Sequence, residues 1–189
     1  MATLLATIDT APLLDLVDRK GSFVYVEQIV EWHRVGHIEL FASSRLLNPD
    51  TWKMNPKQKA DLRRLLAEHG ITIASSSFRL GISPLGGSDV LGGTEGGRSP
   101  EEMKRFEKIV GPDPASLPPD SVGRGMQRKI GDYDALPDHF ASKRDVFVTL
   151  DKHDYFHTNR RPRYERELGL MIRSPQELVH CYSRDHGAK

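Results

Sequence analysis

A run of β-branched and aromatic residues near the carboxyl end of the chain is followed at once by a threonine and an acid. Val146, Phe147 and Val148 favour a β-strand, and an unbroken apolar run suits a strand covered on both faces, as in a parallel sheet. Thr149 and Asp151 close the run. In open parallel α/β sheets, ligands bind at the carboxyl ends of the strands. We therefore expect Asp151 to belong to an acidic, metal-binding site.

Short apolar runs alternate with amphipathic segments over the first part of the chain. The pattern predicts strands at residues 4–8, 37–42 and 71–74, and helices at 12–20, 24–35 and 56–69. Further elements are expected toward the carboxyl end, with helices at 99–110, 134–140 and 160–168, a strand at 170–172 and a terminal helix opening at 174–177. Such alternation predicts an α/β fold with a mostly parallel sheet.

The middle of the chain has a different composition. Gly86-Gly87, Gly92-Gly93 and Gly96-Gly97 fall within a dozen residues, and the segment 111–119 is rich in proline. Such segments do not hold regular elements, and no second hydrophobic core is evident. We therefore expect one domain over residues 1–189, with an irregular loop insertion at about 79–131.

Composition narrows the possible partners and compartments. The chain has 27 basic and 26 acidic residues, so any attraction to nucleic acid must be local. Cys181 is the only cysteine, which excludes an intrachain disulfide and a cysteine-built zinc site. The amino terminus has the features of neither a signal peptide nor a membrane span. These observations favour a cytoplasmic location with no membrane partner.

Four acids occupy comparable places, at strand ends or at a helix start. They are Asp9, Asp50, Asp134 and Asp151. Strand ends of a parallel sheet share one edge, and clustered carboxylates repel one another unless a cation lies between them. Carboxylate oxygens suit Mg²⁺ or Mn²⁺, either of which activates a bound water for attack on a phosphodiester. The alternative is that each aspartate is a local cap or turn residue.

Three segments resemble the PIN-like domain family. Ile8-Asp9-Thr10 is similar to the amino-terminal signature of that family, and residues 145–151 are similar to its late strand, which ends in Thr-x-Asp. Residues 172–178 resemble its final strand and last helix, so the likeness reaches both ends and about half of the chain. It implies a three-layer α/β/α fold and metal-dependent cleavage of RNA, usually single-stranded.

The resemblance also assigns the metal-binding acids. Asp9 and Asp151 match the family best. Asp134 takes the place of the acid on the helix ahead of the late strand, with Asp132 and Asp138 as rivals. The resemblance therefore implies that Asp9, Asp134 and Asp151 hold Mg²⁺ or Mn²⁺.

The second acid of the family has two candidates in this chain. The family places it a few residues past a strand end that contains serine, and here Ser44 is followed six residues later by Asp50. Glu39 is the competitor, although it lies within the expected strand. Thr10 or Thr149 would position a water or an acid through a hydrogen bond.

Basic and aromatic residues alternate directly after Asp151. The tract contains Lys152, Arg160, Arg161, Arg163 and Arg166, with His153, His157 and the aromatic residues Tyr155, Phe156 and Tyr164 between them. Beside an acidic metal site, such a tract would contact the phosphates of an RNA strand and stack on its bases. The alternative is a solvated helix face with its aromatic residues in the core.

The leading hypothesis is therefore a metal-dependent endoribonuclease. The resemblance also implies that such a nuclease can be the toxin of a toxin–antitoxin pair. Its partners would then be an antitoxin protein or a second copy of the chain. The first alternative is a PIN-like domain that binds RNA or a protein without cleaving. The second is an α/β protein unrelated to nucleases, in which the acids only cap helices.

Overall fold

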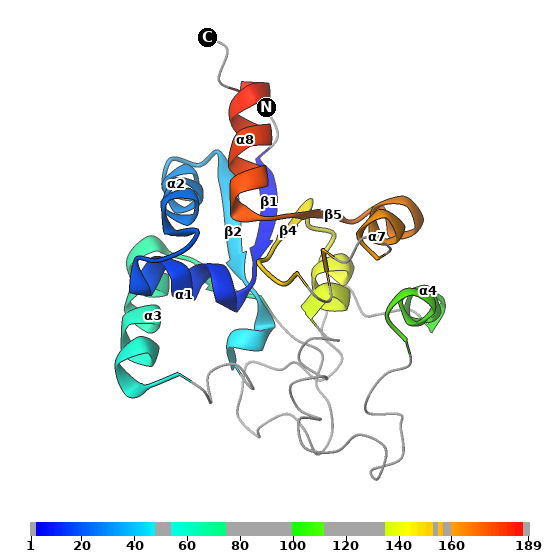
Figure 1. Ribbon diagram of the computed structural model, residues 1–189, viewed down its shortest axis with the longest axis horizontal. Coiled ribbons are helices and arrows are strands. Elements are labelled where there is room, and N and C mark those ends of the chain that lie inside the picture. The colour runs from blue at the N-terminus through cyan, green and yellow to red at the C-terminus, as the bar shows by residue number, and fades with distance from the viewer. Residues whose placement is uncertain are drawn as a thin grey trace.

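A computed structural model describes residues 3–47, 54–74, 100–111, 135–152, 155–156 and 160–186. Within these ranges, five parallel strands form one sheet in the order β3-β2-β1-β4-β5 (Figure 1). The strands are β1 (Leu4–Ile8), β2 (Ile38–Ala42), β3 (Thr72–Ile73), β4 (Val146–Val148) and β5 (Met171–Arg173). The predicted α/β fold with a parallel sheet is confirmed.

The helices also lie close to where the sequence predicts them. They are α1 (Thr10–Asp18), α2 (Phe23–Arg34), α3 (Pro56–His69), α4 (Pro100–Val110), α7 (Arg161–Leu168) and α8 (Pro175–His186), with a 3₁₀ turn η1 (Ser44–Leu47) and helical residues 135–141. The rest of the expected insertion at 79–131, outside 100–111, lies outside the described residues. Among the described residues, no helix combines the length and apolar character that a membrane span requires.

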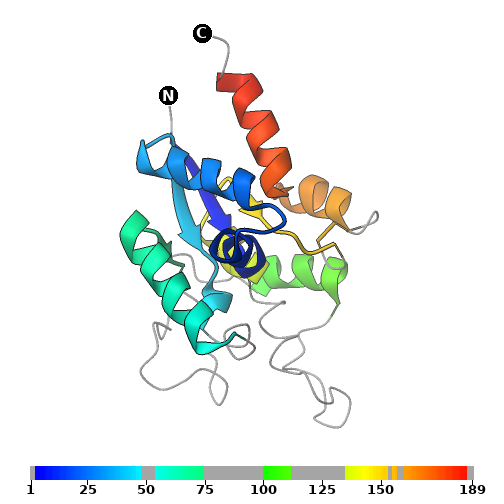
Figure 2. The same cartoon turned by 60° about the vertical axis from the view of Figure 1, so that its left-hand side comes forward.

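Alternate side chains of the strands enter two separate hydrophobic clusters. Ile8 and Val148 pack with residues of α1, α2, α3 and α8, whereas Phe147 and Ile172 pack with residues of α4, α7 and 135–141. Figures 1 and 2 show these two groups of helices on opposite sides of the sheet. This alternation explains why the three consecutive residues of β4 are all apolar, because both faces of this central strand are buried.

The order of the strands creates a switch point between β1 and β4. The chain runs outward from β1 through β2 to β3, and then returns to the other side of β1 to form β4. The ladder continues past both strand ends, since Asp9 N–H donates to Val148 O at 2.8 Å. Ligands of doubly wound sheets bind at the carboxyl ends of the strands that flank such a point.

The predicted terminal helix begins with a capping box formed by Ser174 and Glu177. Ser174 N–H donates to Glu177 Oε2 at 2.8 Å, and Glu177 N–H donates to Ser174 Oγ at 3.2 Å. The two contacts satisfy backbone donors that would otherwise have no partner in the first turn. They fix the start of α8 directly after β5.

Replacing Gly21, which lies between α1 and α2, is a first test of the fold. It lies at φ +53°, and an added Cβ would come within 2.3 Å of Asp15 Oδ2. That oxygen accepts hydrogen bonds from the N–H and the hydroxyl of Ser22 at 2.7 and 3.0 Å. We expect Gly21→Ala to lower the free energy of unfolding by about 2 kcal/mol, through backbone strain and the displaced carboxylate. Urea denaturation measures the loss.

Gly36→Ala is the matched control for this prediction. Gly36 also has a positive φ, of +81°, but a Cβ there would meet nothing within 4 Å. It should therefore cost only the backbone strain, about 1 kcal/mol. Equal losses in the two variants would show that the contact with Asp15 contributes nothing.

Candidate functional site

Asp9 is a buried acid at the carboxyl end of β1. Asp9 is only 2% exposed, and it is the N-cap residue of α1. Oδ1 accepts a hydrogen bond from Thr10 N–H at 2.8 Å, and Oδ2 accepts one from Thr149 Oγ1, also at 2.8 Å. The carboxylate is therefore held in one orientation at the switch point.

Thr149 connects the two strand ends that flank the switch point. Its hydroxyl donates to Asp9 Oδ2 and accepts a hydrogen bond from Asp151 N–H at 3.1 Å. Its own N–H donates to Arg173 O at 3.1 Å, which holds it beside β5. The predicted positioning role of Thr149 thus has a geometric basis. One hydroxyl orients Asp9 and fixes the backbone that carries the half-buried Asp151.

A third acid, Asp138, lies beside the end of β2. It belongs to helical residues 135–141 and is 5% exposed. Ser44 Oγ donates to Asp138 Oδ2 at 3.0 Å. The residue before Ser44, Ser43, donates its N–H to Ile8 O at 2.8 Å, so the ends of β1 and β2 adjoin. Asp9 and Asp138 therefore come to neighbouring strand ends.

The remaining acids of the predicted site divide into two groups. Asp50, Asp132 and Asp134 lie outside the described residues. Within the part of the chain that the structure describes, no three of the histidine, cysteine, aspartate and glutamate side chains form a group suited to a metal. The described portion of the site thus comprises Asp9, Asp138 and Asp151, without forming a closed three-residue ligand set.

Glu39, the competitor for the second acid, does not lie at this edge. It is exposed on β2 and pairs in register with Leu5, three positions before Ile8 in β1. At about 3.3 Å per residue, its Cα lies roughly 10 Å from the strand end. Glu39 therefore lies away from the carboxyl ends of the strands, where the other described acids of the site are found.

Thr10 has a buried hydroxyl that no described residue satisfies with a hydrogen bond. The residue is 3% exposed, and Oγ1 has no hydrogen-bond partner among the described residues. A buried polar atom of this kind usually binds an ordered water. Its position directly after Asp9 fits a site in which oxygen ligands hold a hydrated divalent cation, because Mg²⁺ needs only one or two carboxylates beside its waters.

A buried polar layer lies behind Asp138. The ring of His139 is 1% exposed, with Nδ1 2.9 Å from Thr7 Oγ1, and Arg144 Nη1 donates to the same hydroxyl at 3.4 Å. Burial, and then the charge of Arg144, lower the pKa of His139 from 6.5 to about 3. His139 is therefore neutral. Its Nδ1 contact is with the Thr7 hydroxyl.

Two arginines of the basic tract form ion pairs and hydrogen bonds with other residues of the protein. Arg161 contacts Glu165 and Glu177, and Arg163 contacts Glu167 and donates to Lys108 O of α4 at 3.0 Å. Lys152 is exposed and Arg160 half-buried. Two aromatic residues of the tract, Tyr155 and Tyr164, are buried in the cluster that contains Phe147. For these two, the packing interpretation is correct and base stacking is not available.

Comparisons with known proteins add no family assignment. The chain was compared with models of protein families, with curated proteins and with solved structures, and nothing matched in any of the three. Function is therefore inferred from the geometry at the carboxyl ends of the strands.

Proposed function

We propose that this protein is a PIN-like, metal-dependent endoribonuclease with a three-layer α/β/α fold. The observation that carries the proposal is the contact between Asp9 and Thr149, which joins the two strand ends at the switch point. It brings a buried carboxylate and the backbone of Asp151 to the edge where ligands of such sheets bind. The resemblance to PIN-like domains implies single-stranded RNA as the substrate, and a cation would screen its phosphodiesters from the acids at this edge.

One or two of the described acids would contact the metal directly, and waters would complete its coordination. The candidates are Asp9 after β1, Asp138, which accepts a hydrogen bond from Ser44 after β2, and Asp151 after β4, with Asp50 and Asp134 as further candidates. Mg²⁺ or Mn²⁺ would supply positive charge and lower the pKa of the attacking water. Thr149 orients Asp9, Ser44 orients Asp138, and the Thr10 hydroxyl would hold a water.

A cleavage assay tests this proposal. Purified protein should cleave a fluorogenic single-stranded RNA in Mn²⁺ or Mg²⁺, lose the activity in EDTA and regain it when excess Mn²⁺ is returned. The expected loss is at least about 10²-fold, because the cation both activates water and stabilises charge. Cleavage that persists in EDTA would refute the metal-dependent mechanism.

A second candidate is a PIN-like domain that binds RNA or a protein partner without cleaving. The observation in its favour is that both oxygens of Asp9 already accept hydrogen bonds, one of them as the cap of α1. RNA binding without Mn²⁺-dependent cleavage would support this candidate over the nuclease.

A further inference from the structure

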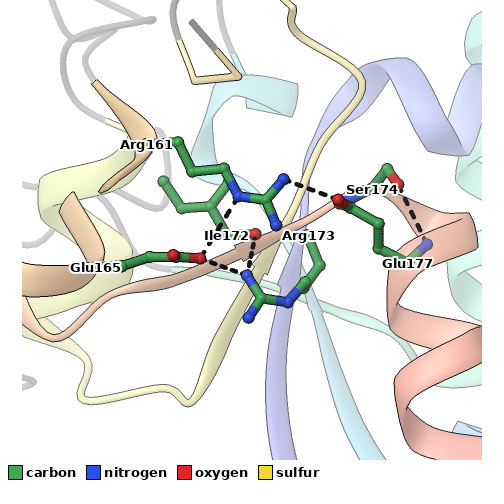
Figure 3. Close-up of polar contacts among 6 residues, drawn as sticks. All are labelled: Arg161, Glu165, Ile172, Arg173, Ser174 and Glu177. Atoms are coloured by element: carbon green, nitrogen blue, oxygen red, sulfur yellow. Dashed lines mark hydrogen bonds and ion pairs between the residues drawn. The ribbon is translucent and has the colours of Figure 1, made fainter. Parts of the chain in front are cut away.

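Four charged side chains form a continuous network beside the carboxyl end of β5. Arg161 of α7 donates from Nη1 to Glu177 of α8 at 2.8 Å and from Nε to Glu165 at 3.4 Å. Glu165 also accepts a hydrogen bond from Arg173 Nη1, and that same nitrogen donates to Ile172 O at 2.7 Å. Figure 3 shows Arg161 between the two glutamates. The network ties α7 to β5 and to the first turn of α8.

The face of the same arginine covers an aromatic ring of the loop after β4. Arg161 Cζ lies 4.9 Å from the centre of the Phe156 ring, a cation–π contact. Phe156 N–H in turn donates to Asp151 O at 3.2 Å. We call Arg161, its two glutamates Glu165 and Glu177, and Phe156 the Arg161 clamp. Through the Phe156 N–H, the clamp is hydrogen-bonded to the backbone carbonyl of Asp151, a proposed metal ligand.

Asp151 is thereby held from both sides. Its N–H donates to Thr149 Oγ1 at 3.1 Å, and its carbonyl accepts the hydrogen bond from Phe156. The first contact depends on the strand, whereas the second depends on the clamp. Removing the clamp should therefore free one side of the Asp151 backbone and leave β4 unchanged.

We propose that Arg161 is a positioning residue that holds the Asp151 loop through Phe156, and that it is not an RNA contact. This rests on the proposed function only in that Asp151 is taken to bind the metal. Arg161 has a side chain 22% exposed, and two carboxylates occupy its Nε and Nη1 donors. A phosphate would have to displace those carboxylates to form a two-point contact with these donors.

Hydrogen exchange tests the clamp without requiring enzymatic activity. In Arg161→Met the stem remains but the charge is lost, so the Phe156 amide should exchange about fivefold faster, the size expected for a lost cation–π contact. Phe156→Leu should accelerate exchange at residue 156 equally, and the double variant no further. Phe156→Tyr retains a ring and should exchange like the wild type.

Arg64→Met is the matched control. Arg64 of α3 also contacts two acids, Asp61 at 2.9 Å and Glu68 at 3.8 Å, and has no described link to the Asp151 loop. Exchange at Phe156 should be unchanged in this variant. Unchanged exchange in Arg161→Met would overturn the proposal.

Cleavage kinetics then separate positioning from RNA contact. Arg161→Met should raise the Mn²⁺ concentration for half-maximal cleavage about tenfold, as loss of outer contacts to a metal ligand commonly does. The KM for RNA at saturating Mn²⁺ should not change. A raised KM with an unchanged Mn²⁺ requirement would make Arg161 an RNA contact and overturn the proposal. Where the wild type cleaves no RNA, the proposed function fails, and the exchange experiment still decides whether the clamp exists.

Discussion

Replacing Asp9 with asparagine is expected to reduce Mn²⁺-dependent RNA cleavage by about 10²-fold or more, because the change removes a carboxylate from the proposed metal site. The fold should survive. The asparagine oxygen can still accept the Thr10 N–H, and its amide can donate to the Thr149 hydroxyl. Initial rates over a range of Mn²⁺ concentrations, together with thermal unfolding, measure both effects.

Asp145→Asn is the matched control for this prediction. Asp145 precedes β4, at the amino ends of the strands, where its Oδ2 accepts a hydrogen bond from Leu5 N–H of β1 at 2.7 Å. Its replacement should leave the cleavage rate unchanged. If Asp9→Asn leaves the cleavage rate unchanged and Mn²⁺ shifts the melting temperature of neither the variant nor the wild type, Asp9 is a structural cap and the binding candidate is favoured.

The strands and helices could be predicted because each is determined by residues within it or directly beside it in the sequence. The 14 residues of α3 (Pro56–His69), for example, begin after the cap Asn55 and end at Gly70, which has φ +66°. Each of these signals lies within one or two residues of the boundary it sets. The sequence also predicted that Asp9 and Asp151 lie at the same edge of the sheet, because a parallel sheet brings the carboxyl ends of all its strands to one edge.

Contacts between distant segments could not be predicted in the same way. Ser44 and Asp138 are 94 positions apart, and their hydrogen bond depends on how residues 135–141 pack against the sheet. Asp138 therefore looked no better than Asp132 or Asp134 in the sequence. The pairing of Arg161 with Glu177 likewise depends on β5 bringing α8 beside α7. Tract composition alone could not distinguish a paired arginine from an RNA-binding one.

His139→Phe is expected to change how the stability of the protein depends on pH. Burial, and secondarily the charge of Arg144, lower the pKa of His139 to about 3 in the folded state, against 6.5 for an ordinary histidine. As pH falls below 6.5, the unfolded chain binds a proton that the folded chain does not. Wild-type stability should therefore fall by up to about 1.4 kcal/mol per pH unit from pH 6.5 toward pH 3.

The phenylalanine variant should lack this contribution, and its curve should cross that of the wild type. Near pH 8 it is expected to be less stable by about 1 kcal/mol, because Thr7 loses its hydrogen bond to His139. By pH 5 the wild type has lost about 2 kcal/mol through His139, so the variant becomes the more stable protein. Urea denaturation at pH 8, 6.5 and 5 measures the crossing, with the same replacement at His180, an exposed residue of α8, as control.

Parallel curves of stability against pH for the wild type and His139→Phe would mean that His139 takes up a proton within the folded protein. The buried layer of Thr7, His139 and Arg144 would then have to open under Asp138 in mild acid, and cleavage should fall over the same pH range.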